Sequence, residues 1–134
     1  MSKILVVEDD KKIALALAVR LKAKGYETIV THDALGGVSA AVKEKPDLLV
    51  LDISMPAGGG FSVAQRLRNR ADTAAIPIIF ITASKRADFK DQAAELGAVA
   101  YFEKPYDADL LVATIQETLG DRADYHPGTI LREA

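Results

Sequence analysis

Short hydrophobic runs alternate along this chain with longer stretches in which hydrophobic residues recur every three or four positions. The runs at 4–7, 48–51, 77–81 and 99–102 are almost wholly hydrophobic, which is typical of strands covered on both faces. The run at 26–31 alternates polar and apolar residues, so it predicts a half-exposed strand at a sheet edge. The pattern therefore predicts five strands.

Helical periodicity occupies the intervals between these strands. At 10–24 hydrophobic residues recur every four positions and Gly25 follows, which predicts an amphipathic helix. Similar patterns predict helices at 33–45, 61–69, 85–96 and 107–119. Five strand–helix units imply a mostly parallel sheet with helices on both faces. We predict an α/β domain over 1–120 and a short C-terminal extension of unknown role over 121–134.

Composition narrows the range of partners and compartments. The net charge of −2 leaves no basic stripe or tail that would favour nucleic acid as a direct partner. The hydrophobic runs are too short to cross a membrane, and the N-terminus lacks the pattern of a signal peptide. The absence of cysteine excludes disulfides and thiolate metal sites and fits a reducing compartment, so we expect a cytoplasmic protein.

Polar side chains follow four of the predicted strands. They are Glu8, Asp9 and Asp10 after the first, Asp52 after the third, Thr82 after the fourth, and Lys104 with Pro105 after the fifth. The carboxyl ends of parallel strands meet at one edge of a sheet, where ligands bind in open α/β folds. Two carboxylates about 5 Å apart repel by roughly 3 kcal/mol at an effective dielectric near 20. We therefore expect a cation among these acids.

Magnesium is the cation that this set of ligands favours, because it takes a few carboxylates plus waters and leaves room for phosphate oxygens. A calcium loop would need its ligands on one segment, whereas Asp9 and Asp52 are far apart in the chain. His32 and His126 do not have the spacing of a transition-metal site.

The same residues predict phosphoryl transfer. Asp52 can act as a nucleophile toward phosphorus and form an aspartyl phosphate. The metal, the Thr82 hydroxyl and the Lys104 ammonium would stabilise charge on the phosphoryl oxygens.

Four strings at these strand ends carry a resemblance to a known family. They are VVEDD (6–10), LVLDISMP (49–56), FITA (80–83) and YFEKP (101–105). Over residues 3–120 the chain resembles bacterial two-component response-regulator receiver domains of the stand-alone type. The resemblance implies a flavodoxin-like (βα)5 doubly wound parallel sheet with strand order 2-1-3-4-5.

The resemblance also implies a role for each site residue. Asp52 would be the phosphoacceptor, and Glu8, Asp9, Asp52 and the main-chain carbonyl of Ser54 would hold magnesium. Thr82 and Tyr101 would form the switch pair, and Lys104 would contact the phosphate. The Lys104–Pro105 peptide bond resembles one that is cis in the family.

The function implied is a phosphorelay switch. A histidine kinase or phosphotransfer protein would donate the phosphoryl group from a phosphohistidine. The face of the fourth helix, fifth strand and fifth helix would then change its preference for a downstream protein. Such a chain catalyses only its own phosphorylation and dephosphorylation, as a monomer or a phosphorylation-dependent dimer.

Each site residue also has a simpler structural explanation. Asp10 is expected to cap the following helix, and Asp52 could cap a loop. Thr82 could cap a helix, Lys104 could be a surface lysine, and Tyr101 could be a core aromatic residue.

Two features depart from the family pattern. Gly58, Gly59 and Gly60 replace a stretch that usually carries an acid, and they predict a mobile loop after Asp52. By family analogy, the small Ser54 and Ser84 occupy positions that tune phosphate lifetime.

Three other functions compete with this one. A haloacid-dehalogenase-like phosphatase would need an aspartate at the position of Ser54. A flavodoxin-type electron carrier would need a glycine- and hydroxyl-rich loop where three acids stand. A phosphate-independent receiver would only bind partners. For a receiver without an output domain, the outputs left open are a phosphorelay shuttle, a docking switch, and an input module excised from a larger chain.

Overall fold

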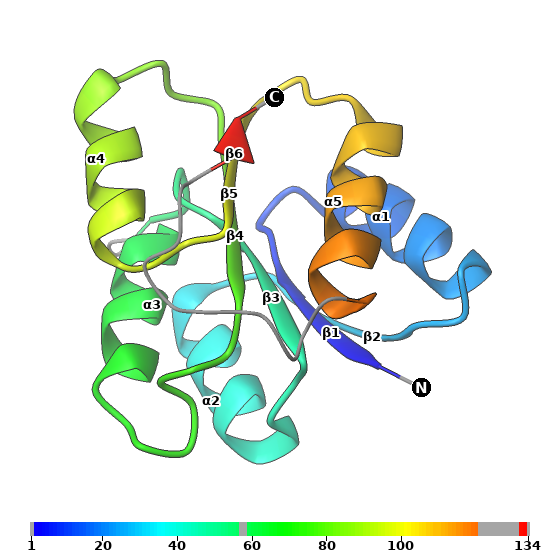
Figure 1. The fold of residues 1–134 in the computed structure, drawn as a ribbon, viewed down its shortest axis with the longest axis horizontal. Helices are drawn as coiled ribbons and strands as arrows, with labels where there is room; N and C mark the ends of the chain where they lie inside the picture. Colours follow the sequence, from blue (N-terminus) through cyan, green and yellow to red (C-terminus); the bar gives the residue numbers. More distant parts are fainter. Residues whose placement is uncertain (1, 57–58, 121–131, 134) are drawn as a thin grey trace.

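A parallel β-sheet lies between two layers of helices in the computed structural model, which describes residues 2–56, 59–120 and 132–133 (Figure 1). The strands are β1 (Lys3–Val7), β2 (Glu27–Thr31), β3 (Leu48–Asp52), β4 (Ile78–Thr82), β5 (Ala100–Glu103) and β6 (Arg132–Glu133). The helices are α1 (Lys11–Ala23), α2 (Ala34–Glu44), α3 (Gly59–Arg68), α4 (Ala87–Glu95) and α5 (Ala108–Gly120).

The strand order is β2-β1-β3-β4-β5-β6, and every neighbouring pair is parallel. The first five strands confirm the predicted flavodoxin-like order 2-1-3-4-5. As expected from its alternating pattern, β2 lies at a sheet edge and its residues stay partly exposed. Strands β3 and β4 lie inside the sheet and are buried along their whole length.

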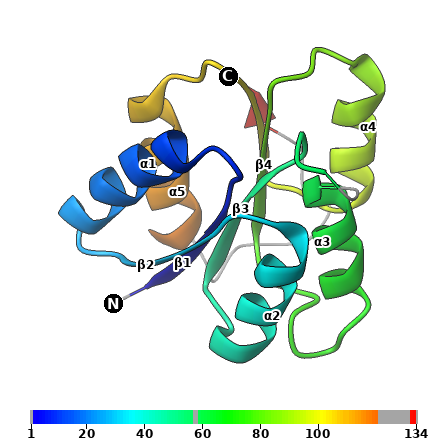
Figure 2. The same ribbon diagram turned by 180° about the vertical axis from the view of Figure 1, so that it is seen from behind.

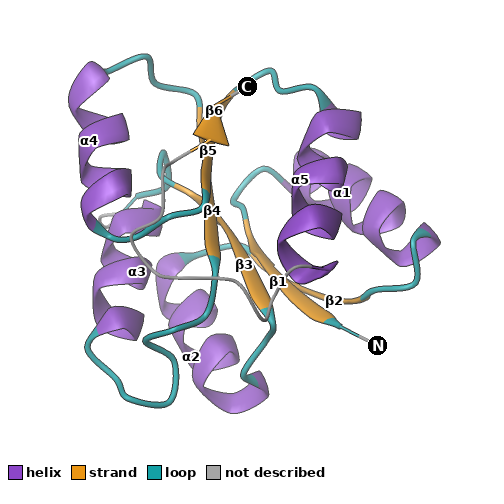
Figure 3. Cartoon of the chain, in the orientation of Figure 1, coloured by secondary structure: helices purple, strands orange, loops and turns teal. Residues whose placement is uncertain are grey.

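The helices divide between the two faces of the sheet. Helices α1 and α5 cover one face, and α2, α3 and α4 cover the other (Figures 2 and 3). On the first face Leu17, Leu21 and Ile115 pack against β1, β3 and β4. On the second, the ring of Phe61 in α3 meets Phe80 of β4 edge to face, with ring centroids 5.1 Å apart. Successive side chains of each strand point to opposite faces of the sheet, so each strand contributes to both hydrophobic layers.

The sixth strand was not predicted from the sequence. Arg132 and Glu133 pair in parallel with Ala100 and Tyr101 at the edge of the sheet beyond β5. An edge strand leaves main-chain donors and acceptors unpaired, and such groups accept another extended segment whatever its side chains are. Most of the C-terminal extension, 121–131 and residue 134, lies outside the described residues.

Two of the three consecutive glycines begin α3, whereas the sequence predicted a mobile loop over all three. Gly58 lies outside the described residues, but Gly59 and Gly60 are buried against the end of β3. A Cβ on Gly60 would lie 2.8 Å from the main-chain oxygen of Asp52, and one on Gly59 would overlap the main-chain oxygen of Ile53. Gly59 also has a positive φ of 54°. These glycines bring α3 into close contact with the strand that carries Asp52.

Of the helices within the described residues, none has the length and the hydrophobicity that a membrane span requires.

We expect Gly59→Ala to destabilise the protein by roughly 1–3 kcal/mol, because it adds both a clash with backbone and a left-handed conformation that alanine disfavours. The matched control is Gly120→Ala, since a Cβ there meets nothing within 4 Å. The free energy of unfolding in urea measures both variants. Equal stability of the two would contradict the close approach at Gly59.

Candidate functional site

The ends of β1, β3, β4 and β5 meet at one edge of the sheet. Asp52 pairs with Ile81, and Thr82 pairs with Glu103, in the parallel register. Residues that follow these strands are therefore neighbours in space although they are far apart in sequence. The edge brings together the predicted acids, the hydroxyl and the lysine.

Asp52 is the last residue of β3, and its side chain is completely buried. Its Oδ1 accepts a hydrogen bond from the Ser54 main-chain N–H at 2.9 Å. Its Oδ2 accepts one from Lys104 Nζ at 3.2 Å. A loop-capping role explains only the first of these contacts, so the carboxylate is held at the strand ends by more than local loop structure.

The acids after β1 divide between two tasks. Glu8 is completely buried, and its Oε2 accepts the Asp10 main-chain N–H at 3.0 Å. Asp10 caps α1 by accepting from the main-chain N–H groups of Lys12 and Ile13, as expected. Asp9 is exposed, and one of its carboxylate oxygens lies within 4.8 Å of an oxygen of Glu8 and of Asp52.

Lys104 follows β5 and reaches into the acids. Its Nζ lies 2.7 Å from Glu8 Oε1 and 3.2 Å from Asp52 Oδ2, and only 15% of its side chain is exposed. The alternative of a surface lysine is therefore wrong. The Lys104–Pro105 peptide bond is cis, the form that the resemblance implies.

Burial and charge give the two buried acids different protonation states. Burial raises the pKa of Glu8 from 4.5 to about 8, and the neighbouring Asp52 adds to the rise. Burial acts in the same direction on Asp52, but its interactions with Glu8, the Ser54 N–H and Lys104 outweigh it and hold the pKa of Asp52 below its usual value. Near neutral pH, Glu8 therefore keeps its proton and Asp52 is ionised.

The acids fit a metal ion as well as a lysine. One carboxylate oxygen each from Glu8, Asp9 and Asp52 lies within 4.8 Å of the other two. All three are hard oxygen ligands, which suit magnesium and calcium rather than softer metals. A divalent cation there would favour ionisation of Glu8, which the protein alone disfavours. This cluster could hold a metal ion.

Thr82 ends β4 and is buried beside the acids. Its Oγ1 accepts the Ser84 main-chain N–H at 3.0 Å and lies 3.1 Å from Ser54 Oγ. The residue before α4 is Arg86, so Thr82 does not cap that helix. The helix-cap alternative is therefore wrong for Thr82.

Tyr101 lies on β5 and is 97% buried in the hydrophobic layer beneath α3 and α4, since only 3% of its surface is exposed. This position agrees with the core-aromatic alternative. A role in a switch stays a prediction.

Two contacts at this edge were not foreseen from the sequence. His32 follows β2, and its Nδ1 lies 2.9 Å from the main-chain oxygen of Glu8. A carbonyl only accepts hydrogen bonds, so Nδ1 carries the proton and donates. The Ser54 hydroxyl, for which the sequence predicted no contact, bridges the ends of β3 and β4. A lone histidine or serine gave no spacing signal that could have found either contact.

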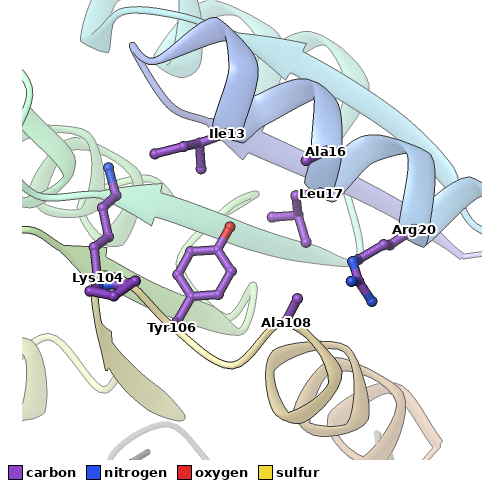
Figure 4. Close-up of a pocket in the computed structure, with 8 residues that line it drawn as sticks. Ile13, Ala16, Leu17, Arg20, Lys104, Tyr106 and Ala108 are labelled. Carbon is purple, nitrogen blue, oxygen red and sulfur yellow. The ribbon is translucent and has the colours of Figure 1, made fainter.

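A pocket of about 300 Å³ adjoins the site between α1 and α5. Figure 4 shows Lys104 and Tyr106 on one side of it and Ile13 and Leu17 of α1 on the other. Its lining is mainly hydrophobic apart from Lys104, Tyr106 and Arg20. Lys104 thus lies between the acidic cluster and this mainly hydrophobic pocket.

Comparison with known families gives one match across most of the chain. The family model described as the response regulator receiver domain matches residues 4–116. The signal receiver domain of a DNA-binding response regulator from Colwellia psychrerythraea superposes with a TM-score of 0.82 at 29% identity, covering 90% of this chain and 99% of that one.

Two curated relatives differ in how much of their length is shared. PilH of Pseudomonas aeruginosa is 34% identical over 119 residues, which cover 89% of this chain and 98% of PilH. The DNA-binding transcriptional regulator RpaA of Synechocystis sp. is 35% identical over 119 residues, which cover 89% of this chain but 49% of RpaA. The chain therefore spans nearly all of one relative and about half of the other.

The raised pKa of Glu8 predicts a pH dependence of stability in the absence of divalent cations. The folded chain holds the Glu8 proton more tightly than the unfolded chain, whose carboxyl titrates near 4.5. The resulting stabilisation is complete below that value and is lost as the pH rises to about 8. We expect the free energy of unfolding in urea with EDTA to fall by roughly 1–3 kcal/mol between about pH 6.5 and about pH 8.5.

The control for this prediction is Glu8→Gln, which keeps Asp52, Lys104 and His32 but removes the titrating carboxyl. The fall should disappear in that variant. A wild-type protein that is equally or more stable at the higher pH would refute the assignment of the proton to Glu8.

Proposed function

Because the chain belongs to the family of response regulator receiver domains, we propose that it is a phosphorylation switch in which Asp52 accepts a phosphoryl group from a phosphohistidine. The observation that carries this proposal is the environment of Asp52. A buried, ionised carboxylate has one oxygen on a lysine and lies beside two further acids that could hold a cation. Such a carboxylate is a nucleophile with the charges needed for phosphoryl transfer already around it.

Magnesium is the cation we propose for the cluster. Glu8, Asp9 and Asp52 would hold it, together with the main-chain carbonyl of Ser54. When bound, magnesium would neutralise charge on the transferring phosphoryl group and on the acids. Asp9 is the exposed member of the three, so it lies where the ion enters from solvent.

The chain's own residues carry the transfer. One oxygen of Asp52 attacks phosphorus while the bond from phosphorus to the donor imidazole breaks and its electron pair returns to the ring. Lys104 Nζ, now on Asp52 Oδ2, is placed to bind a phosphoryl oxygen, and Thr82 brings the hydroxyl of β4 one residue beyond the strand partner of Asp52. Water attack on the same phosphorus breaks its bond to the Asp52 oxygen, releases inorganic phosphate and restores the carboxylate, which resets the switch. The chain thus catalyses its own modification and its reversal, not the turnover of a separate substrate.

The output we propose is a change in the α4-β5-α5 face. Movement of Thr82 toward the phosphoryl oxygens would alter the space next to Tyr101, whose ring is packed beneath α4. A downstream protein would distinguish the two states of this face. In the present structure β6 pairs with β5, so Arg132 and Glu133 occupy the sheet edge within that face.

The partners and setting follow from this mechanism. The donor is a histidine kinase or phosphotransfer protein, and the output is protein binding rather than direct contact with nucleic acid or membrane. We propose a receiver domain over 1–120, with 121–134 as an extension, acting in the cytoplasm as a monomer or as a dimer that forms on phosphorylation. The absence of cysteine is compatible with that compartment.

The competing functions fit the site less well. A haloacid-dehalogenase-like phosphatase needs a general acid where Ser54 stands, and the Ser54 hydroxyl is instead engaged with Thr82. A flavodoxin-type carrier would place flavin phosphate against Glu8, Asp9 and Asp52, which repel it. A receiver that only binds partners does not need Lys104 in contact with two buried acids.

Incubation with acetyl phosphate tests the acceptor. We expect an adduct that requires magnesium, is stable in acid and is labile in alkali, seen by intact-mass measurement. Asp52→Asn should abolish it because an amide does not attack phosphorus at this site.

The matched control is Asp91→Asn, which removes an exposed aspartate of α4 outside the site and should leave the adduct unchanged. An adduct that persists in Asp52→Asn, or one that forms equally well without magnesium, would overturn the proposal.

A further inference from the structure

The Ser54 side chain connects the end of β3 to the end of β4. Its Oγ accepts the Ala83 main-chain N–H at 3.0 Å and shares a hydrogen bond with Thr82 Oγ1 at 3.1 Å. Its own main-chain N–H donates to Asp52 Oδ1 at 2.9 Å. One serine therefore contacts both the carboxylate of Asp52 and two polar groups at the end of β4, the Thr82 hydroxyl and the Ala83 N–H.

Phosphorylation of Asp52 would place new hydrogen-bond acceptors beside these two groups. A phosphoryl group carries close to two negative charges and three oxygens that accept hydrogen bonds. The Thr82 hydroxyl and the Ala83 N–H lie one and two residues beyond Ile81, the β4 partner of Asp52. In the structure both are engaged with Ser54 Oγ. Ser54 Oγ thus accepts the Ala83 N–H and shares a hydrogen bond with the Thr82 hydroxyl, in which either oxygen can donate. A phosphoryl oxygen would compete for the same two groups.

We propose that the Ser54 hydroxyl is a latch of the phosphate-free state: it holds the Thr82 hydroxyl and the Ala83 N–H, and it must release them before they can bind a phosphoryl oxygen. Ser54 acts here as a positioning residue, through Thr82 and Ala83. The inference rests on the proposed function, since it concerns phosphorylation at Asp52.

The release needs only a local movement. Ser54 is exposed, so rotation about its Cα–Cβ bond carries the hydroxyl into solvent, where water replaces its partners. The main-chain N–H on Asp52 and the main-chain carbonyl do not take part in that rotation. The latch therefore competes with the phosphoryl group without altering the backbone around the acids.

The competition predicts an uncommon direction of effect. Removing a hydroxyl from a binding site normally weakens binding, but Ser54→Ala removes a competitor for two donors. A hydrogen bond contributes on the order of a three- to tenfold change in an equilibrium constant. We therefore expect the variant to bind a phosphoryl mimic about three- to tenfold more tightly than the wild type.

The experiment is a titration of the full chain with beryllofluoride, the phosphoryl mimic, in the presence of magnesium. Ser54→Ala should bind more tightly, and Ser54→Thr, which restores the hydroxyl, should bind like the wild type. Ser39→Ala is the matched control, because it removes the same hydroxyl from an exposed serine of α2 outside the site, and its affinity should not change. Equal or weaker binding by Ser54→Ala overturns the latch, while a wild type that binds no beryllofluoride overturns the proposed function as well.

A second measurement tests the latch without any ligand. Amide hydrogen exchange at Ala83, followed by NMR in the absence of magnesium and beryllofluoride, should be faster in Ser54→Ala than in the wild type and in Ser39→Ala. A merely structural role would speed exchange throughout the β4 end, whereas the latch predicts an increase centred on Ala83. Unchanged exchange at Ala83 overturns the inference even if the wild type is phosphorylated as proposed.

Discussion

The repulsion among three carboxylates at one sheet edge is the constraint on which the rest of the site depends. A buried Glu8 and a buried Asp52 next to Asp9 cannot all be ionised without a cation. In this structure the repulsion is reduced in two ways: Lys104 contacts both buried acids, and Glu8 retains its proton. Because that arrangement is only partly neutralised, it remains receptive to a divalent cation and, next to it, to a phosphoryl group.

The fold is what brings these three acids so close together. Parallel strands place residues from distant parts of the sequence at one edge, and helices on both faces bury them. Buried strands β3 and β4 fix the backbone of Asp52 and Thr82, while Gly59 and Gly60 let α3 approach the same strand end. The buried strands therefore hold the backbone of the acceptor site in place. The exposed Ser54 side chain is free to change its rotamer.

Much of this was predictable from sequence because it follows from periodicity and strand ends. Continuous hydrophobic runs located the inner strands, alternation placed β2 at an edge, and the residues after each run are those that the structure assembles. Contacts that depend on side-chain rotamers were not predictable, as for the Ser54 hydroxyl. The strand β6 was not predictable either. It pairs through main-chain groups, and two residues are too few to show a hydrophobic pattern. The prediction of a mobile loop was wrong for Gly59 and Gly60, because glycine is favoured both in flexible loops and where two segments pack closely.

The most direct test of the central claim is paramagnetic broadening of NMR signals by manganese, which substitutes for magnesium at oxygen ligands. We expect substoichiometric manganese to broaden the signals of Glu8, Asp9 and Asp52 first. Asp47, at the opposite end of β3, should be unaffected until much higher occupancy. Broadening centred away from the three acids, or none at all, would contradict a cation site at this sheet edge.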